Sequence, residues 1–424
     1  MSQGSEDDFD FVDPFSGMFA GEAPTIPTDS LIDLPQAHRL FREIAWGQSE
    51  HLYGYQQPLA ASSGPWVERG GRRLLMLSAY DYLGLIGHPA IMAGAIAAIE
   101  RYGTGTGGVR LLTGTAGIHH ELEQALADFL GVEAVATFNS GYDANLAVLS
   151  AVLGPGDVAM LDVRAHRSLL DGCRLAGVEI QHFSHNDVAD LDVKLSRLSP
   201  GRRCLVVVDG VYSMDGDVCR LDALLSVAKR HRARVLVDDA HALGTLGPRG
   251  AGTASHFGID PKEIDVITGS LNKSIPAGGG FVAGRRDLIV YLQHVAAPYM
   301  FSAALPPASA GAALAGIRVM EKEPERLARL RRNTEKLASG LRRLDIDIGT
   351  SQTPIIPVMA GSNEQAYRMS RRLVDAGIIA MPVIPPAVPR GRSLLRLCVT
   401  AAHGEDDIDF ALTAFASLSS PVDG

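Results

Sequence analysis

Seven short apolar segments follow one another through the middle of the chain, and their alternation with helix-like segments restricts the fold more than any other feature. Cys204-Leu-Val-Val-Val208 is apolar throughout, which is typical of a strand covered on both faces. The pattern therefore predicts an α/β domain around a mostly parallel, seven-stranded sheet. The predicted strands are 133–138, 157–162, 179–183, 204–209, 234–239, 266–270 and 280–284, and helical patterns lie near 142–153, 167–176, 187–198 and 220–232.

Changes in composition divide the rest of the chain. Residues 1–33 combine acidic residues with phenylalanines, and we interpret them as a flexible acidic arm, a disordered tail being a better reading than a docking motif. Residues 34–79 predict a helix and a hairpin, and 80–307 form the predicted large domain. Residues 308–424 predict a smaller α+β domain that begins with a long helix, with a break expected at Pro324.

Composition excludes several classes of protein. No apolar run approaches the roughly 18 residues that a membrane span requires, and no signal peptide is recognisable, so we expect a cytoplasmic protein. The four cysteines form no Cys-x-x-Cys pair, which argues against a disulfide framework or a zinc site, and we expect no metal. A net charge of −9 argues against nucleic-acid binding.

Lys273 is the candidate catalytic residue. It lies just beyond the predicted strand 266–270 and is followed by Gly278-Gly-Gly280, where backbone can approach a bulky group closely. A lysine in a dry pocket has a lowered pKa and can form a Schiff base, the usual attachment of pyridoxal 5'-phosphate (PLP). The alternative is a structural lysine at a strand end.

Small and aromatic polar residues follow two other predicted strands. Ser140-Gly141-Tyr142 opens a helix after the strand 133–138, and a helix N-terminus is a natural seat for a phosphate group. His166 follows the strand 157–162, where its ring could stack on a flat cofactor. Each signal is weak alone, because small residues are common at such turns and single histidines are usually structural.

Two further strand ends carry polar groups. Asp238 and Asp239 end an apolar strand, so alternation directs one of the two carboxylates toward the site. A buried carboxylate needs a cationic partner, which a protonated pyridine nitrogen would provide, and His241 could donate to a ring hydroxyl. Ser213 lies in a loop after the strand 204–209 and could orient the cofactor. The alternatives are a capping aspartate and an ordinary turn.

Taken in order along the chain, these residues resemble the fold-type I PLP enzymes, and more narrowly the α-oxoamine synthases. Within that family the chain is most similar to bacterial serine palmitoyltransferases. The resemblance covers about residues 40–420. Its most specific segments are Tyr82-Leu-Gly-Leu, Gly105-Thr-Gly-Gly-Val-Arg110, Thr113-Gly-Thr with His119, Ser140-Gly-Tyr, Gly210-Val-Tyr-Ser-Met-Asp-Gly-Asp217, Asp238-Asp-Ala-His241, Phe301-Ser-Ala-Ala-Leu-Pro-Pro307 and Leu394-Leu-Arg-Leu-Cys398.

The resemblance implies an activity and a set of roles. The expected reaction joins an amino acid (serine, alanine or glycine) to an acyl thioester, on coenzyme A or an acyl carrier protein, with loss of carbon dioxide. The family implies a homodimer with shared active sites. The implied catalytic residues are Lys273, His166, Asp238 and His241; the implied cofactor-binding residues also include Ser140, Gly141, Tyr142, Ser213, Ser270 and, from a neighbouring subunit, Ser302; the implied substrate-binding residues are Arg396, Tyr82 and Arg110.

The chain also departs from the family pattern. Ile384 stands where serine palmitoyltransferases often carry an arginine, with Arg390 and Arg392 nearby, Asp81 replaces an asparagine, and Val109 replaces a serine or threonine. These differences leave open 8-amino-7-oxononanoate synthase or 2-amino-3-ketobutyrate CoA ligase activity. Another fold-type I activity, an aminotransferase or a lyase, is a further alternative. A non-catalytic partner subunit is disfavoured, because such subunits tend to lack the lysine.

Overall fold

The computed structural model describes residues 14–19, 22–60 and 64–418. The acidic residues of the predicted arm between 1 and 13 lie outside the described residues. Phe19 is buried against Ile44 and Ala45 of helix α1 (Pro35–Ser49), so this part of the predicted arm makes packing contacts that its composition did not predict.

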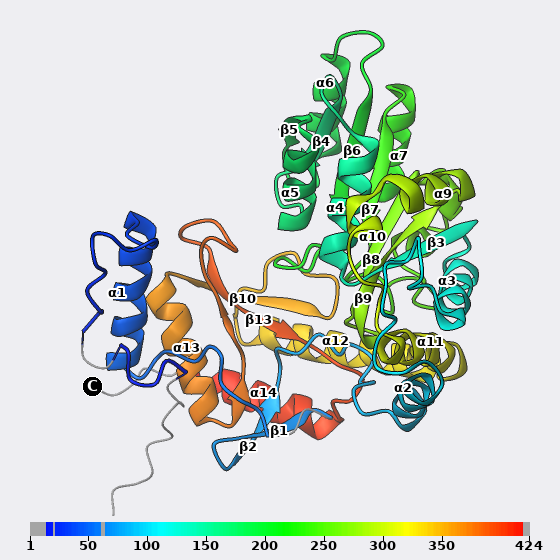
Figure 1. Ribbon diagram of the computed structural model, residues 1–424. Coiled ribbons are helices and arrows are strands. Elements are labelled where there is room, and N and C mark those ends of the chain that lie inside the picture. The colour runs from blue at the N-terminus through cyan, green and yellow to red at the C-terminus, as the bar shows by residue number, and fades with distance from the viewer. Residues whose placement is uncertain (1–13, 20–21, 61–63, 419–424) are drawn as a thin grey trace, which may run out of the picture.

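A seven-stranded sheet forms the centre of the molecule (Figure 1), with the strand order β3-β9-β8-β7-β6-β4-β5. Strands β8, β7, β6, β4 and β5 pair in parallel, as expected for an α/β sheet. Strand β9 runs antiparallel to both of its neighbours, β3 and β8. All seven predicted strands are present, which confirms the predicted fold class. They are β3 (Ala134–Phe138), β4 (Val158–Asp162), β5 (Glu179–Phe183), β6 (Cys204–Asp209), β7 (Arg234–Asp238), β8 (Val266–Asn272) and β9 (Pro276–Gly284).

Helices cover both faces of this sheet. Along β6, Val206 and Val208 join one buried cluster with residues of α3, whereas Leu205 and Val207 join a second cluster with residues of α4 and α5. Successive side chains of a strand point to opposite faces, so an all-apolar strand requires two such layers. The helices of this region are α2 (Pro89–Tyr102), α3 (Gly117–Leu130), α4 (Gly141–Val152), α5 (Arg167–Ala176), α6 (Val188–Ser196), α7 (Leu221–Arg230), α8 (Thr253–Phe257), α9 (Arg286–Val295) and α10 (Ala297–Met300).

Two long helices lead into the C-terminal part of the chain. Helix α11 (Pro307–Lys322) and helix α12 (Glu325–Arg343) are separated at Pro324, where the sequence predicted a break. A three-stranded sheet follows, in which β10 (Ile355–Gly361) and β12 (Pro382–Val383) both pair with β13 (Ser393–Cys398) in antiparallel fashion. Helices α13 (Asn363–Asp375) and α14 (Glu405–Leu418) pack beside it.

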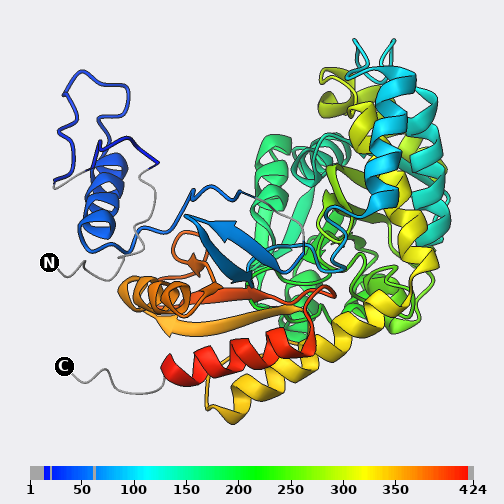
Figure 2. The ribbon, with the colours of Figure 1, turned by 90° about the horizontal axis from the view of Figure 1, so that it is seen from below.

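The N-terminal hairpin joins the C-terminal part of the chain. Strands β1 (Trp66–Arg69) and β2 (Arg72–Met76) form the predicted hairpin, and β2 pairs in parallel with β11 (Ile378–Ile379). In Figure 2 the blue hairpin accordingly lies beside the orange C-terminal elements. This arrangement brings residues 77–82 to the carboxyl edge of the central sheet, where the candidate site lies.

Across the described ranges, the structure contains no helix that is both long enough and apolar enough to cross a membrane.

Candidate active site

A pocket of about 240 Å³ lies at the carboxyl ends of the central strands. In an open α/β sheet this edge is the usual ligand-binding edge, because the βα loops converge there. Eight of the predicted residues line the pocket: Ser140, Gly141, Tyr142, His166, Asp238, His241, Ser270 and Lys273. Residues that the sequence did not single out also line it, among them Asn145, Ser168, Asp209 and Asn272.

Lys273 lies in the turn between β8 and β9, and its side chain lines the pocket. Within the described part of the chain, its Nζ atom donates no hydrogen bond. Burial lowers the pKa of Lys273 below its ordinary value, and the attraction of Asp238 and Asp209 opposes this shift only in part. The amine is therefore easier to deprotonate than that of a surface lysine.

Asp238 and Asp239 point in opposite directions, as strand alternation requires. Asp238 lines the pocket, where its carboxylate accepts hydrogen bonds from Asn145 Nδ2 at 2.7 Å and from the Ala240 amide at 2.9 Å. Asp239 instead accepts from the Thr253 hydroxyl at 2.6 Å and from the Thr253 amide at 2.9 Å. Asp238 is thus the carboxylate that a bound ligand can reach.

A hydrogen-bonded chain connects His166 with Asp238. His166 Nδ1 lies 2.7 Å from the Ser168 hydroxyl, and Asn145 Nδ2 donates to that hydroxyl at 2.9 Å as well as to Asp238. Burial lowers the pKa of His166, so the ring is neutral near pH 7. The chain of contacts holds the imidazole and the carboxylate on one wall of the pocket.

Asp209 is a second buried carboxylate in the pocket. It ends β6 and stands opposite Asp238 in the pairing of β6 with β7. Its carboxylate accepts a hydrogen bond from the His166 amide at 3.1 Å. Burial and the nearby charge of Asp238 raise its pKa well above the ordinary range. Because Asp209 ends a predicted strand, the sequence could have indicated it as a site residue, but it was not among the predicted ones.

His241 and Tyr82 lie together beside the pocket. The Tyr82 hydroxyl is 2.8 Å from His241 Nδ1, and Tyr82 is completely buried. Burial, together with the nearby Lys273 and His166, lowers the pKa of His241 well below its ordinary value. The imidazole is consequently neutral and can either donate or accept a hydrogen bond.

The start of α4 forms the floor of the pocket on one side. Ser140 is the N-cap of α4, and its hydroxyl accepts from the Asp143 amide at 3.0 Å. The backbone here approaches β9 very closely, because a Cβ atom on Gly280 would lie 2.3 Å from the Gly141 nitrogen. On β8, the strand next to β9, the Ser270 hydroxyl is hydrogen-bonded to the Asn272 side chain. These contacts aim the free N–H groups of the helix start at the pocket.

Ser213 and Arg396 lie next to each other at the rim. Arg396 Nη1 donates to the Ser213 carbonyl at 3.3 Å, and its guanidinium lies 4.5 Å from the centre of the Tyr80 ring. The Tyr80 hydroxyl also contacts Arg396 Nη2. Arg396 comes from β13, so the C-terminal sheet brings a cation to Tyr80, whose ring centre lies 5.9 Å from that of the pocket residue His241.

His185 holds the loop that carries Ser213. Its two ring nitrogens lie 3.0 Å from the carboxylates of Asp162 and Asp217. Burial alone would lower the pKa of His185, but the hydrogen bonds and charges of Asp162 and Asp217 raise it to about 9. The imidazole is therefore a partly buried cation near pH 7. Both nitrogens are already engaged, so we assign no metal to the neighbouring group of His185, Asp215 and Asp217.

Five predicted residues do not line this pocket: Tyr82, Ser213 and Arg396, described above, and Arg110 and Ser302. Arg110 is buried, and its guanidinium donates to both carboxylate oxygens of Glu123, at 2.8 and 3.0 Å. Because this ion pair occupies the guanidinium, we no longer assign Arg110 to substrate binding. Ser302 accepts a hydrogen bond from Asn139 Nδ2 at 3.0 Å, next to the start of α4 but not in the wall of this chain's pocket.

Comparison with known proteins identifies the family. The family model for aminotransferase class I and II matches residues 72–415. The chain is 41% identical to the serine palmitoyltransferase of Sphingobacterium spiritivorum, over 86% of this chain and 91% of the relative. It is 42% identical to the 8-amino-7-oxononanoate synthase of Symbiobacterium thermophilum, over 86% and 94%. The chain belongs to the α-oxoamine synthase family.

Solved structures agree with this assignment to the α-oxoamine synthases. One, described as a serine palmitoyltransferase with a PLP internal aldimine, superposes with a TM-score of 0.87 and is 35% identical, covering 90% of this chain and 97% of the other. The serine palmitoyltransferase of Sphingomonas wittichii gives a TM-score of 0.87 at 34% identity, covering 91% and 97%. This α-oxoamine synthase therefore has the PLP fold-type I architecture that its sequence predicted.

Proposed function

We propose that this chain is a PLP-dependent C-acyltransferase that condenses a small amino acid with an acyl thioester and releases carbon dioxide. The observation that carries the proposal is the placement of Lys273 in one pocket with Asp238 and His166, in a chain of the α-oxoamine synthase family. A lysine amine, a buried carboxylate and a flat ring are the three groups that PLP chemistry requires.

The residues present fit PLP. The amine of Lys273 has no hydrogen-bond partner among the described residues, and Ser140, Gly141 and Tyr142 at the start of α4 line the same pocket, where a phosphate group could meet the helix N-terminus. Ser140, Tyr142 and Ser270 would supply further polar contacts to that phosphate. Bound PLP supplies a pyridinium ring that withdraws electrons from the α-carbon of a linked amino acid.

The protein's own groups would keep the cofactor protonated and move one proton. Asp238, held by Asn145 and by the Ala240 amide, presents a carboxylate to the pyridine nitrogen. His166 would stack on the cofactor ring, while His241 and Ser213 would contact the oxygen of the ring hydroxyl. Lys273 is the proposed base: its lowered pKa makes the neutral amine available to accept the α-proton and to return it later.

Arg396 is the proposed partner of the substrate carboxylate. A guanidinium binds a carboxylate through two parallel hydrogen bonds. Arg396 lies against the Tyr80 ring, whose centre is 5.9 Å from that of His241 in the pocket wall. Tyr82 would support this side of the site through His241. Ile384 cannot contribute a charge, but Arg392 lies near the rim, 3.7 Å from Asp215.

Two activities of the family remain candidates for this chain. Serine palmitoyltransferase-like condensation is the main proposal, because several solved serine palmitoyltransferases superpose on almost the whole chain. The similarity to 8-amino-7-oxononanoate synthases is equally high in sequence, which favours that activity as the second candidate. The two candidate activities also differ in the acyl group that is transferred and in whether coenzyme A or a carrier protein holds it.

We also propose that the protein acts as a cytoplasmic homodimer. Leu112 and Phe301 are 77% and 79% exposed, and the segments that carry them are adjacent, since Val109 bridges Ala303. Such an exposed apolar surface is typical of a subunit interface. Ser302 lies within it, which supports a contribution of this serine to the active site of a second copy.

Titration of the purified protein with single amino acids tests the proposal. The visible absorption band of the PLP-loaded protein should change with one or two of serine, alanine and glycine. Adding an acyl-CoA should then release free thiol and carbon dioxide together, and only when both substrates are present. Amino-group transfer to a keto acid without thiol release would instead support an aminotransferase. A protein that cannot be loaded with PLP would overturn the proposal in favour of a partner subunit.

A further inference from the structure

A second and larger cavity, of about 790 Å³, lies at the opposite edge of the central sheet from the active site. It is formed where β6, β7 and β8 begin, since Cys204, Arg234 and Val266 line it. The proposed reaction takes place at the carboxyl ends of the same strands, so this cavity has no part in it. The length of the strands, about 17–20 Å for five to six residues, separates the two sites.

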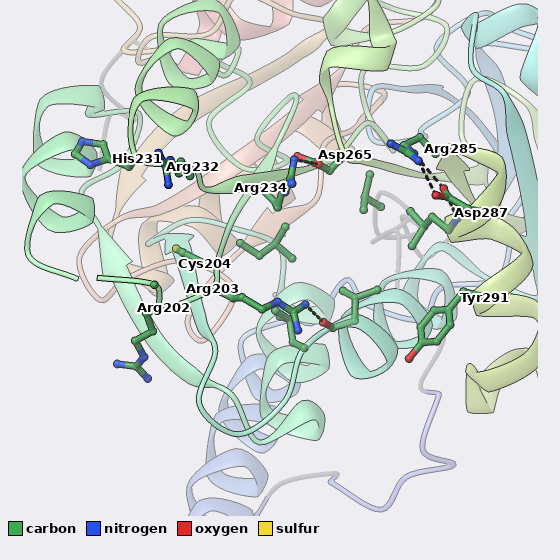
Figure 3. A pocket seen from close by; sticks show the side chains of 16 residues that line it. Arg202, Arg203, Cys204, His231, Arg232, Arg234, Asp265, Arg285, Asp287 and Tyr291 are labelled. Atoms are coloured by element: carbon green, nitrogen blue, oxygen red, sulfur yellow. Dashed lines mark hydrogen bonds and ion pairs between the residues drawn. The ribbon is translucent and has the colours of Figure 1, made fainter. Parts of the chain in front are cut away.

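Arginines surround this cavity. Five of them come from three connections between elements, α6 to β6, α7 to β7 and β9 to α9: Arg202, Arg203, Arg232, Arg234 and Arg285. Figure 3 shows Arg203 on one side of the hollow and Arg234 and Arg285 on the other, whereas Arg202 points away. In a protein with a net charge of −9, this convergence of cationic groups is a local exception.

Among the described residues, carboxylates lie within ion-pair distance of four of the five arginines and leave Arg232 without one. Arg202 lies 2.7 Å from Glu179, and Arg285 donates to both oxygens of Asp287, at 3.1 and 2.6 Å. Asp265 and Asp287 are the acidic residues in its wall, and Asp157 and Glu179 lie beside it. Arg203 lies 3.7 Å from Asp157, and Arg234 lies 3.3 Å from Asp265. Asp157 and Asp265 also accept backbone hydrogen bonds, at 3.0 and 2.9 Å. Arg203 Nη2 donates to the Val152 carbonyl at 2.9 Å, and Arg234 Nη1 donates to Asp265, so each of these guanidinium groups uses only part of its five donors.

Arg232 adds a further cation in an unusual backbone conformation. It has a φ of 57°, in the left-handed region that glycine favours after a helix, and it follows His231, the C-cap of α7. No hydrogen bond or ion pair joins its guanidinium to a described residue. Its exposed side chain contributes a full positive charge to the cavity wall.

The rest of the wall is apolar and aromatic. Leu153, Leu205, Val266 and Leu288 line it, and the Tyr291 ring closes one end, as Figure 3 shows. Tyr291 is half exposed, and its hydroxyl donates to the Ala151 carbonyl at 3.2 Å, which fixes the ring. A flat ring beside several guanidinium groups is suited to a ligand with an aromatic part and more than one negative charge.

We propose that this cavity binds a small organic di- or polyphosphate, with its phosphates on Arg203, Arg232 and Arg234 and its aromatic part against Tyr291. Phosphate is favoured over a single carboxylate because Arg203 comes from one connection and Arg232 and Arg234 from another, and each guanidinium fork can bind phosphate oxygens in pairs. The site lies apart from the phosphate seat at Ser140, so it can be filled while PLP is bound.

Calorimetric titration of the PLP-loaded, full-length protein with ADP and, separately, with inorganic pyrophosphate tests this proposal. At about 0.15 M salt we expect ADP to bind once per chain with a Kd of about 100 μM or lower, and pyrophosphate to bind more weakly. Pyrophosphate that binds as tightly as ADP would overturn the role of Tyr291. Failure of both to bind below about 1 mM would overturn the site itself.

Paired variants locate the binding. Arg203→Gln with Arg234→Gln should weaken ADP binding at least about tenfold, because each neutral side chain removes charge-assisted hydrogen bonds. Arg368→Gln, on the exposed face of α13, is the matched control and should leave the Kd unchanged. An unchanged Kd in the double variant, with an unaltered melting temperature, would contradict the proposal. A change in the visible band of PLP on adding ADP would place the ligand in the catalytic pocket and would also overturn it.

Discussion

At the scale of single residues, the chemistry of the pocket depends on small shifts in protonation. Lys273 loses protons more easily than a surface lysine, and His166 and His241 stay neutral, all because burial disfavours their charged forms. At the same edge of the sheet, burial and the charge of Asp238 raise the pKa of Asp209 well above its ordinary value. The pocket therefore combines a basic amine with neutral rings, which is the distribution of charge that proton transfer at a carbon atom requires.

Replacing Lys273 with alanine should abolish turnover. We expect kcat to fall by at least about 10³-fold, because no other amine lines the pocket. The protein should also lose its yellow colour while still binding PLP noncovalently through the other contacts. Absorption spectra and steady-state rates measure both effects. The control is Lys262→Ala in the exposed turn before β8, and an active, coloured Lys273→Ala protein would refute the assignment.

Arg396→Lys should separate substrate binding from cofactor binding. A lysine keeps the charge but not the paired hydrogen bonds of a guanidinium, so KM for the amino acid should rise about tenfold or more. The affinity for PLP should remain within about twofold, since Arg396 lies at the rim. Kinetics at saturating thioester measure the first effect and PLP titration the second. An unchanged KM would remove Arg396 from the substrate site.

At the scale of elements, the site depends on how closely α4 approaches the central sheet. The start of α4 rests on β9 with no room for one extra carbon atom, because a Cβ on Gly280 would lie 2.4 Å from the Ser140 carbonyl oxygen. The same strand pairs with β8, which leads to Lys273. The spacing between phosphate seat and lysine is thus set by backbone contacts rather than by flexible side chains.

Gly280→Ala should therefore weaken PLP binding and lower stability. The added methyl group must push α4 away from β9, at a cost of about 1–3 kcal/mol in the free energy of unfolding. Urea unfolding of the apo protein measures stability, and PLP titration measures the displaced phosphate seat. Gly154→Ala is the matched control, because a Cβ there meets no atom within 4 Å. Equal effects at the two positions would contradict the close-contact argument.

The loop between β6 and α7 depends on the charge of one histidine. His185 has a folded pKa of about 9, above the unfolded value of about 6.5, so its stabilising contribution is complete below about pH 6.5. That contribution is lost as the pH rises through about 9. We expect the free energy of unfolding to fall by about 2 kcal/mol between about pH 7 and pH 10 for this group. Urea unfolding measures it, and His185→Gln should remove this part of the pH dependence; an identical profile in the variant would refute it.

At the scale of the whole molecule, the described surface leaves an apolar area around Leu112 and Phe301 uncovered. Its position beside Asn139 and Ser302 places it near the phosphate seat. A second copy of the chain covering this area would shield both the apolar side chains and one side of the active site from water.

Replacing Leu112 and Phe301 together by aspartate should dissociate the proposed dimer. Two charges in an apolar interface, with the loss of about 1.5–3 kcal/mol of burial for each side chain, should weaken association at least about 100-fold. Analytical ultracentrifugation at several concentrations measures it. Leu175→Asp, at another exposed leucine, is the control. A wild-type protein that stays monomeric at all concentrations would contradict the dimer.

The sequence predicted the central sheet well because each strand carries its own signal. An all-apolar run such as 204–208 identifies a buried strand without reference to any other segment. The pairing of β2 with β11 has no such local signal, since β11 contains only two residues. In the site, most residues at strand ends were predicted, but Asp209 at the end of β6 and Asn145 were missed. An asparagine one turn into a helix is ordinary by itself, and only the fold brings it to Asp238.

The pairing of Leu75 with Ile378 also affects how the protein can be made. On a ribosome that adds about 5–20 residues per second, β2 emerges roughly 15–60 s before its partner strand. All seven strands of the central sheet are synthesised in that interval. The large sheet can therefore close first, while the early hairpin keeps an open edge until the last tenth of the chain arrives. Nascent chains stalled before β11 should be the ones most in need of a chaperone.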